Sequence, residues 1–182
     1  DDDEDGLADT AEDINNNGLL DAGETDPLNS DTDGDTVGDA IDNCPRISNV
    51  NQTNTDGLQD GGNACDLDDD EDGLADTAED INNNGVLDAG ETDPLDPDTD
   101  ADTVGDASDN CPRTSNLDQT NTDGLQDGGN ACDDDDDEDG LTDTAEDIDS
   151  DGILDAGETD PLDPDTDGDT IGDATDNCPT TA

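Results

Sequence analysis

Carboxylates at alternate positions open the chain and could together bind a metal ion. Asp1, Asp3 and Asp5 are followed by Gly6 and, at the twelfth position, by Glu12. In a twelve-residue calcium-binding loop, positions 1, 3 and 5 supply side-chain oxygens and a glycine at position 6 allows a sharp turn. Position 7 supplies its carbonyl, position 9 binds through water, and a carboxylate at position 12 closes the site. Residues 1–12 match this pattern and predict a Ca²⁺ site.

The choice of Ca²⁺ follows from the ligand chemistry. Ca²⁺ takes six to eight oxygens at about 2.3–2.6 Å, whereas Mg²⁺ requires a tighter octahedron and keeps several waters. Zinc sites usually combine Cys and His, but the chain has no His and no CxxC pair, in which two residues separate two cysteines. Ca²⁺ is therefore the expected cofactor.

Two more loops of this kind follow, at residues 13–24 and 31–42. In the second loop, Asn15 and Asn17 replace two acids, so we expect a lower charge and weaker binding. In the third, Thr36 replaces the glycine and Asp42 replaces the glutamate. The sequence therefore does not decide whether the sharp turn forms or whether the last carboxylate binds the ion through both of its oxygens. The predicted ligands are Asp1, Asp3, Asp5, Leu7, Asp9, Glu12, Asp13, Asn15, Asn17, Leu19, Asp21, Glu24, Asp31, Asp33, Asp35, Val37, Asp39 and Asp42.

The whole pattern recurs along the chain. The opening segment returns at Asp68 and at Asp135, which divides the chain into repeats at 1–67, 68–134 and, incomplete, 135–182. Three loops in each repeat predict nine sites. The second repeat supplies Asp68, Asp70, Asp72, Leu74, Asp76, Glu79, Asp80, Asn82, Asn84, Val86, Asp88, Glu91, Asp98, Asp100, Asp102, Val104, Asp106 and Asp109. The third supplies Asp135, Asp137, Asp139, Leu141, Asp143, Glu146, Asp147, Asp149, Asp151, Ile153, Asp155, Glu158, Asp165, Asp167, Asp169, Ile171, Asp173 and Asp176.

A fourth, degenerate loop lies near the end of each complete repeat, at residues 54–66 and 121–133. Asn54, Asp56, Asp60 and Asp66 could bind an ion, but Leu58 stands where an acid is expected. The sequence leaves open whether these loops bind calcium.

The elements that hold the loops must be turns rather than helices or strands. Apolar residues do not recur at helical or strand spacing, and Gly, Asp, Asn and Pro interrupt the chain every few residues. The loops resemble those of EF-hands, but Glu12 and Asp13 belong to adjacent loops, which leaves no room for a flanking helix. Single apolar residues such as Leu28 and Ile41 are expected to pack one loop on the next.

Composition leaves two descriptions of such a chain. Only 25% of its residues are hydrophobic, none is aromatic, and the net charge is −58, so no sizeable core can form. The chain is either a disordered polyanion or is ordered by cations that neutralise its carboxylates. Because the acids keep a strict spacing in every repeat, the sequence favours the ordered alternative. We expect a calcium-stabilised repeat array with little regular secondary structure.

Segments around the cysteines resemble a known family. DTDGDTVGDAIDNCP at 31–45 has copies at 98–112 and 165–179, and an Asn-x-x-Gln stretch precedes Ala-Cys-Asp at 49–66 and 116–133. The chain is similar over its whole length to thrombospondin type 3 repeats. The resemblance implies a chain wrapped around a string of Ca²⁺ ions and disulfides that pair Cys44 with Cys65 and Cys111 with Cys132. It leaves Cys178 to pair with a cysteine beyond Ala182.

The expected function is that of an extracellular calcium-binding structural repeat, as part of a stalk, fibre or adhesin. The alternatives are a spacer within a large secreted enzyme and a low-affinity calcium reservoir or mineral nucleator. Paired carboxylates also serve glycosidases, but without aromatic residues or a core that forms a pocket we expect no catalysis.

Charge and cysteine content set the expected partners and location. The negative charge would repel nucleic acids and anionic lipids, and no apolar run is long enough to insert into a membrane. Disulfides point to an oxidising compartment. Because the chain begins at Asp1 without a signal peptide, we interpret it as a processed or excerpted piece of a secreted protein. Expected partners are calcium ions, further copies of the chain, or a cell-surface or matrix component.

Overall fold

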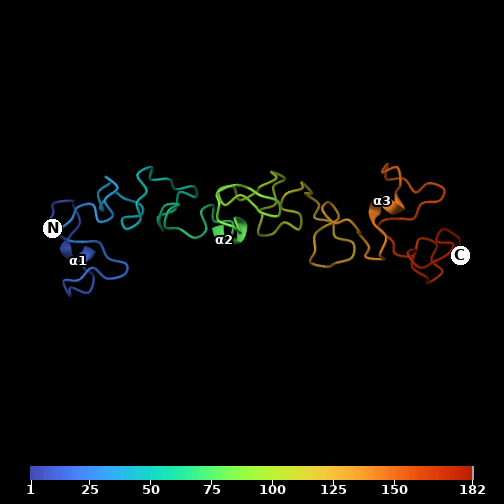
Figure 1. The fold of residues 1–182 in the computed structure, drawn as a ribbon, viewed down its shortest axis with the longest axis horizontal. Helices are drawn as coiled ribbons and strands as arrows, with labels where there is room; N and C mark the ends of the chain where they lie inside the picture. Colours follow the sequence, from blue (N-terminus) through green and yellow to red (C-terminus); the bar gives the residue numbers. More distant parts are fainter. Residues whose placement is uncertain (182) are drawn as a thin grey trace. The chain divides into compact units, whose positions relative to one another are not determined.

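The computed structural model describes residues 1–181 and consists almost wholly of turns and loops (Figure 1). Its helices are single turns: α1 (Asp9–Glu12), α2 (Asp76–Glu79) and α3 (Asp143–Glu146). The described residues contain no β-strand and no helix that could span a membrane. The structure confirms the predicted fold class.

Each helix occupies the last four positions of a first loop, where the sequence is DTAE. Sequence patterns predicted only turns here and missed these helical turns. The backbone N–H of Asp13 donates to the carbonyl of Asp9 at 2.8 Å, but Asp13 has φ −96° and ψ 86°, outside the helical region. Asp13 already begins the next loop. No residues remain to extend the helix, as the sequence predicted.

The structure divides into two compact units, one from Asp1 to Pro97 and one from Asp98 onward. This division falls inside the second sequence repeat, so the compact units do not coincide with the three repeats. The division into 67-residue repeats therefore remains a prediction from the sequence.

The interior of each unit is polar. Among the described hydrophobic residues, only Cys44 and Cys111 are buried. The most buried large side chains include the carboxylates of Glu12, Glu79 and Glu146. Leu28 and Ile41 are 74% and 79% exposed, so the expectation that they pack one loop on the next is wrong. Carboxylates occupy the positions that apolar side chains fill in ordinary domains.

The nine predicted loops share one tight turn in their first half. In each of them, positions 4 and 6 both have positive φ, as at Glu4 (62°) and Gly6 (107°). This pair of left-handed residues curls the chain tightly around the space between the alternate side chains. The loops at 54–66 and 121–133 have the first of these turns, at Gly57 and Gly124, but lack the second.

Candidate calcium sites

Hydrogen bonds between neighbouring residues hold each loop in shape. In the third loop, the N–H of Thr36 donates to Oδ2 of Asp31 at 2.9 Å, and the N–H of Val37 donates to Oδ1 of Asp35 at 2.8 Å. The bond from the N–H of position 7 to the side chain of position 5 recurs in all nine loops. These bonds bring one oxygen each of Asp31, Asp33 and Asp35 within 4.8 Å of one another.

The first loop contains buried oxygens that have no hydrogen-bond donor. Oδ2 of Asp3, Oδ2 of Asp5 and both oxygens of Glu12 are inaccessible to water and accept no hydrogen bond. Glu12 is only 1% exposed. Burying a charge without a partner costs far more than a fold of this size can offset. These oxygens fit a hard divalent cation such as Ca²⁺, which needs several of them at once.

Burial and crowding of carboxylates also raise pKa values in these loops. Burial is the main cause of the raised pKa of Glu12, and the charges of Asp3, Asp5 and Asp39 add to it. In the third repeat the pKa of Glu146 rises to about 7, again mainly through burial. A bound cation would reverse this effect, because a positive charge favours the ionised carboxylates.

Asp39 connects two loops. The sequence assigned Asp39 to position 9 of its own loop, and there its carboxylate accepts the N–H and the hydroxyl of Thr32 at 2.8 and 2.6 Å. The structure also brings one of its oxygens within 4.8 Å of oxygens of Asp5 and Glu12 in the first loop. Loop spacing carries no signal for this contact, so the sequence could not predict it.

The second compact unit repeats this connection. The charge of Asp173 contributes to the raised pKa values of Glu146 and Asp137. Beside it, the N–H of Ala174 donates to Oδ2 of Asp139 at 2.8 Å. The third loop thus reaches the first loop in the third repeat as well.

The structure shows both the turn at Thr36 and the surroundings of Asp42 in the third loop. Thr36 adopts the left-handed turn that glycine usually provides, with φ 84°. Oδ1 of Asp42 accepts the N–H of Cys44 at 2.8 Å and Nε2 of Gln52 at 2.7 Å, while Oδ2 is buried without a partner. The turn therefore forms, and Asp42 has one oxygen left for a metal ion rather than two.

In the second loop, side-chain amides donate hydrogen bonds to the carboxylates. Nδ2 of Asn15 donates to Asp21 at 2.9 Å and to Glu24 at 3.1 Å, and Nδ2 of Asn17 donates to Asp21 at 2.8 Å. These hydrogen bonds lower the pKa of Asp21. No oxygen of this loop is both buried and unpartnered, so its need for a cation is smaller than that of the first loop.

The comparison with protein families decides the identity of this arrangement. The family model for the thrombospondin type 3 repeat matches residues 12–52, 79–119 and 146–182, more than half of the chain. The chain belongs to the thrombospondin type 3 repeat family. Thrombospondin type 3 repeats are calcium-binding structural repeats, in agreement with the acidic loops described above. The comparison with curated proteins gives no match.

The family matches cover the second and third loops of each thrombospondin type 3 repeat. They leave out residues 53–78 and 120–145, which contain the degenerate fourth loop and most of the first loop that follows it.

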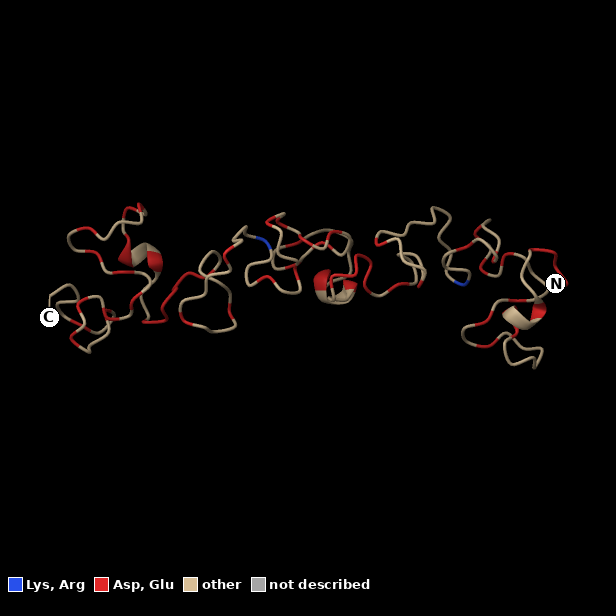
Figure 2. Ribbon diagram, turned by 180° about the vertical axis from the view of Figure 1, so that it is seen from behind, with Lys and Arg blue, Asp and Glu red and all other residues tan. Residues whose placement is uncertain are grey.

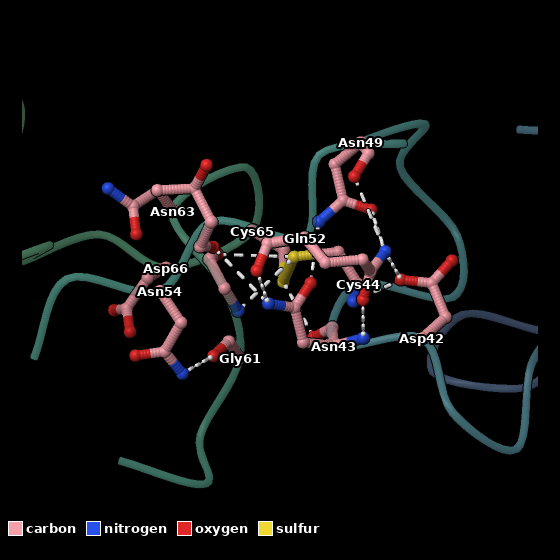
Figure 3. The surroundings of a disulfide bond; sticks show 12 residues. Asp42, Asn43, Cys44, Asn49, Gln52, Asn54, Gly61, Asn63, Cys65 and Asp66 are labelled. Atoms are coloured by element: carbon pink, nitrogen blue, oxygen red, sulfur yellow. Dashed lines mark hydrogen bonds between the residues drawn. A yellow bond between two sulfur atoms is a disulfide. The ribbon is translucent and has the colours of Figure 1, made fainter. Parts of the chain in front are cut away.

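In the fourth loop the structure gathers three acids. One oxygen each of Asp56, Asp60 and Asp66 lies within 4.8 Å of the others, and Oδ2 of Asp56 is buried without a partner. The amide of Asn54 donates to the carbonyl of Gly61 at 2.8 Å (Figure 3). It also donates to the carbonyl of Leu58 at 2.9 Å. The loop therefore has fewer free oxygens than the first loop.

Two disulfides close these fourth loops. Cys44 pairs with Cys65 and Cys111 pairs with Cys132, which confirms the pairing that the family resemblance implied. Cys178 is exposed and forms no disulfide among the described residues.

A polar network surrounds the first disulfide (Figure 3). The side chain of Asn43 donates to the carbonyls of Gln52 and Thr53, and its oxygen accepts the amide of Asn49 at 2.6 Å. The side chain of Gln52 in turn donates to Asp42, a predicted ligand of the third loop. The disulfide and the third loop are thus parts of one hydrogen-bonded structure.

Acidic residues are distributed along most of the chain (Figure 2). Arg46 and Arg113 are its two basic side chains against 60 Asp and Glu. Side-chain cations can therefore balance few of the carboxylates, and the charge must be balanced by ions from solution.

Proposed function

We propose that this chain is an extracellular structural segment of a stalk, fibre or adhesin, and that bound Ca²⁺ orders it. The observation that carries the proposal is Glu12, whose two carboxylate oxygens are buried without a hydrogen-bond donor among other carboxylates. With its carboxylates ionised, such an arrangement is stable only with a cation in its centre. The proposed ligands are the nine loop sets given above.

Order and calcium binding are coupled in this proposal. The unfolded chain presents no complete coordination sphere, so Ca²⁺ binds mainly the folded chain and stabilises it. Extracellular calcium modules bind with dissociation constants of about 10⁻⁴ to 10⁻³ M. We expect consecutive repeats to form a continuous array whose length follows the number of repeats, and its partners to be further copies or a surface or matrix component.

Small-angle scattering with and without calcium tests the proposal. In millimolar Ca²⁺ the chain should give the profile of an ordered particle, and EDTA should convert it into an expanded coil. Mg²⁺ at the same concentration is the control and should restore the ordered profile poorly. An identical profile in Ca²⁺ and EDTA would overturn the proposal.

The same titration separates the alternatives. A calcium reservoir would take up many ions without a change of profile, whereas an ordered segment should saturate as it compacts. A spacer within an enzyme would order in the same way as a stalk, and a catalytic domain in the full-length protein would identify it.

A further inference from the structure

Asn17 and Asn84 each stand immediately before a glycine, at position 5 of the second loops of the first two repeats. The loop pattern forces this pairing. Position 5 supplies a ligand oxygen, and position 6 has positive φ, 73° at Gly18 and 68° at Gly85, which favours glycine. A Cβ added to either glycine would meet no atom within 4 Å, so the surroundings of both pairs are open.

Asparagine is a chemically labile residue, and a following glycine leaves its side-chain amide unhindered. The backbone nitrogen of the glycine attacks Cγ of the asparagine, the Cγ–Nδ2 bond breaks, and ammonia leaves with the proton of the glycine N–H. Water then opens the resulting succinimide ring at one of its two carbonyls. One opening gives aspartate, and the other gives isoaspartate, whose main chain runs through Cβ and Cγ. The net reaction consumes water, releases ammonia and needs no enzyme.

Hydrogen bonds of the closed loop oppose this reaction at Asn17. The N–H of Gly18, which must lose its proton, donates to Oδ2 of Asp13 at 2.7 Å. The negative charge of Asp13 disfavours loss of that proton. Nδ2 of Asn17 donates to Asp21 at 2.8 Å, and its Oδ1 accepts the N–H of Leu19 at 2.7 Å. Asn17 is itself exposed, so these bonds rather than burial protect it.

Asn84 has the same surroundings in the second repeat. The N–H of Gly85 donates to Oδ2 of Asp80 at 2.6 Å. Nδ2 of Asn84 donates to Asp88 at 2.9 Å, and its Oδ1 accepts the N–H of Val86 at 2.7 Å. Asn84 is also exposed. Because no apolar core covers these loops, only a few surface hydrogen bonds must break to open them.

The third repeat shows the composition of the aspartate product. Its second loop has Asp151 before Gly152, so the sequence already provides a carboxylate at position 5. In the first repeat, conversion of Asn17 removes a hydrogen-bond donor from Asp21 and places a carboxylate beside it. A loop that is satisfied by its own amides then becomes a loop that needs a cation.

We propose that Asn17 and Asn84 are sites of spontaneous deamidation, and that their conversion to aspartate makes the second loops of the first two repeats depend on calcium. The dependence on calcium rests on the proposed function, whereas the chemistry of the two amides does not. The aspartate product keeps the loop spacing and adds a ligand. Isoaspartate lengthens the main chain between positions 5 and 6 and disrupts the alternation of ligands. Because both conversions are irreversible, the two amides record how long their loops have been open.

Peptide mass spectrometry during storage tests the proposal. The full chain is kept at mildly alkaline pH in EDTA or in millimolar Ca²⁺, and each asparagine is scored as amide or acid. The internal controls are Asn16 and Asn83, which are exposed in the same loops but precede asparagine. In EDTA, Asn17 and Asn84 should convert more than about tenfold faster than these controls. Calcium should slow both conversions, because an ion bound to the closed loop lowers the population of the open one.

The outcomes separate this proposal from the proposed function. Conversion of Asn17 and Asn84 at the rate of Asn16 and Asn83 would overturn the assignment of the two sites. Small-angle scattering of the same samples reports on the proposed function. If the two sites convert selectively while the profile is identical in Ca²⁺ and EDTA, the proposed function fails and the deamidation sites stand.

The double variant Asn17→Asp/Asn84→Asp tests the consequence of conversion, because it carries the aspartate product without isoaspartate. In EDTA it should be less compact than the unchanged chain, and in a calcium titration it should bind severalfold more tightly. Asn16→Asp/Asn83→Asp adds the same charge outside the predicted ligand sets and is the matched control, which should change neither property. Equal compaction and equal affinity of the two double variants would contradict the proposed dependence on calcium.

Discussion

An oxygen of Asp39 lies within 4.8 Å of an oxygen of Glu12, although the two residues belong to different loops. Two buried carboxylates at this separation repel each other unless a cation lies between them. Calcium at the first loop should therefore fix the third loop in place, so that the loops order together rather than one by one.

Asp39→Asn tests this connection. The substitution removes one negative charge from the group formed by Asp5, Glu12 and Asp39. It should weaken calcium binding roughly tenfold, equivalent to about 1.4 kcal/mol. The calcium concentration at which half of the chains are compact should therefore rise. Circular dichroism during a calcium titration measures the midpoint. The exposed Asp2→Asn, which removes the same charge, should shift it little, and equal shifts in both variants would argue against a specific role for Asp39.

Thr36, Thr103 and Thr170 hold a backbone conformation that suits glycine, with φ of 84°, 84° and 81°. The left-handed region costs a residue with a side chain about 1–2 kcal/mol. Glycine avoids this cost, but it loses more conformational freedom on folding, which offsets part of the stabilisation. Each Thr→Gly substitution should therefore stabilise the calcium-bound chain by about 0.5–1 kcal/mol. Urea unfolding in saturating calcium measures this change, and a loss of stability would show that the threonines make compensating contacts.

The second loops should differ in affinity between repeats. Asn15 and Asn17 of the first repeat correspond to Asp149 and Asp151 of the third, so the third repeat has two more carboxylates at this site. We expect the third repeat to bind calcium more tightly there. In a calorimetric calcium titration, Asp149→Asn/Asp151→Asn should weaken one binding step of the third repeat, and Asn15→Asp/Asn17→Asp should strengthen one binding step of the first repeat. An unchanged titration curve in both variants would contradict this order.

Acidity should affect the calcium-free and calcium-bound chains in opposite directions. The pKa values of Glu146 and Asp137 are raised to about 7 and about 6 in the folded chain, mainly by burial. Their contribution to calcium-free stability is complete below the unfolded values near 4 and is lost as the pH rises through 6 to 7. Calcium needs the ionised carboxylates, so its affinity should instead rise over this range.

Scattering in EDTA and calcium titrations, each at pH 5 and pH 7.5, measure both effects. The calcium-free chain should be more compact at pH 5, and its calcium affinity should be lower there. Glu146→Gln, which cannot ionise, should reduce the pH dependence of compaction. A calcium-free chain that expands at pH 5 would contradict the prediction.

The sequence alone determined the loops of this protein because their bonds are local. Positions 1, 3, 5 and 7 lie within one turn, and the hydrogen bonds that shape it, such as that from Val37 to Asp35, join residues two apart. The residue types at these positions therefore predict the conformation without reference to the rest of the chain. The strained turn at Thr36 shows that the acids at the surrounding positions outweigh the unfavourable residue.

Only the tertiary structure decided which loops meet. The approach of Asp39 to Glu12, the burial of Asp69 at the start of the second repeat and the exposure of Leu28 depend on the path of the chain between loops. Without an apolar core, no hydrophobic pattern in the sequence indicates which faces come together. That path is set by the disulfides, by polar networks such as the one around Asn43, and by carboxylates that gather around common centres, and these contacts join residues too far apart for spacing to predict.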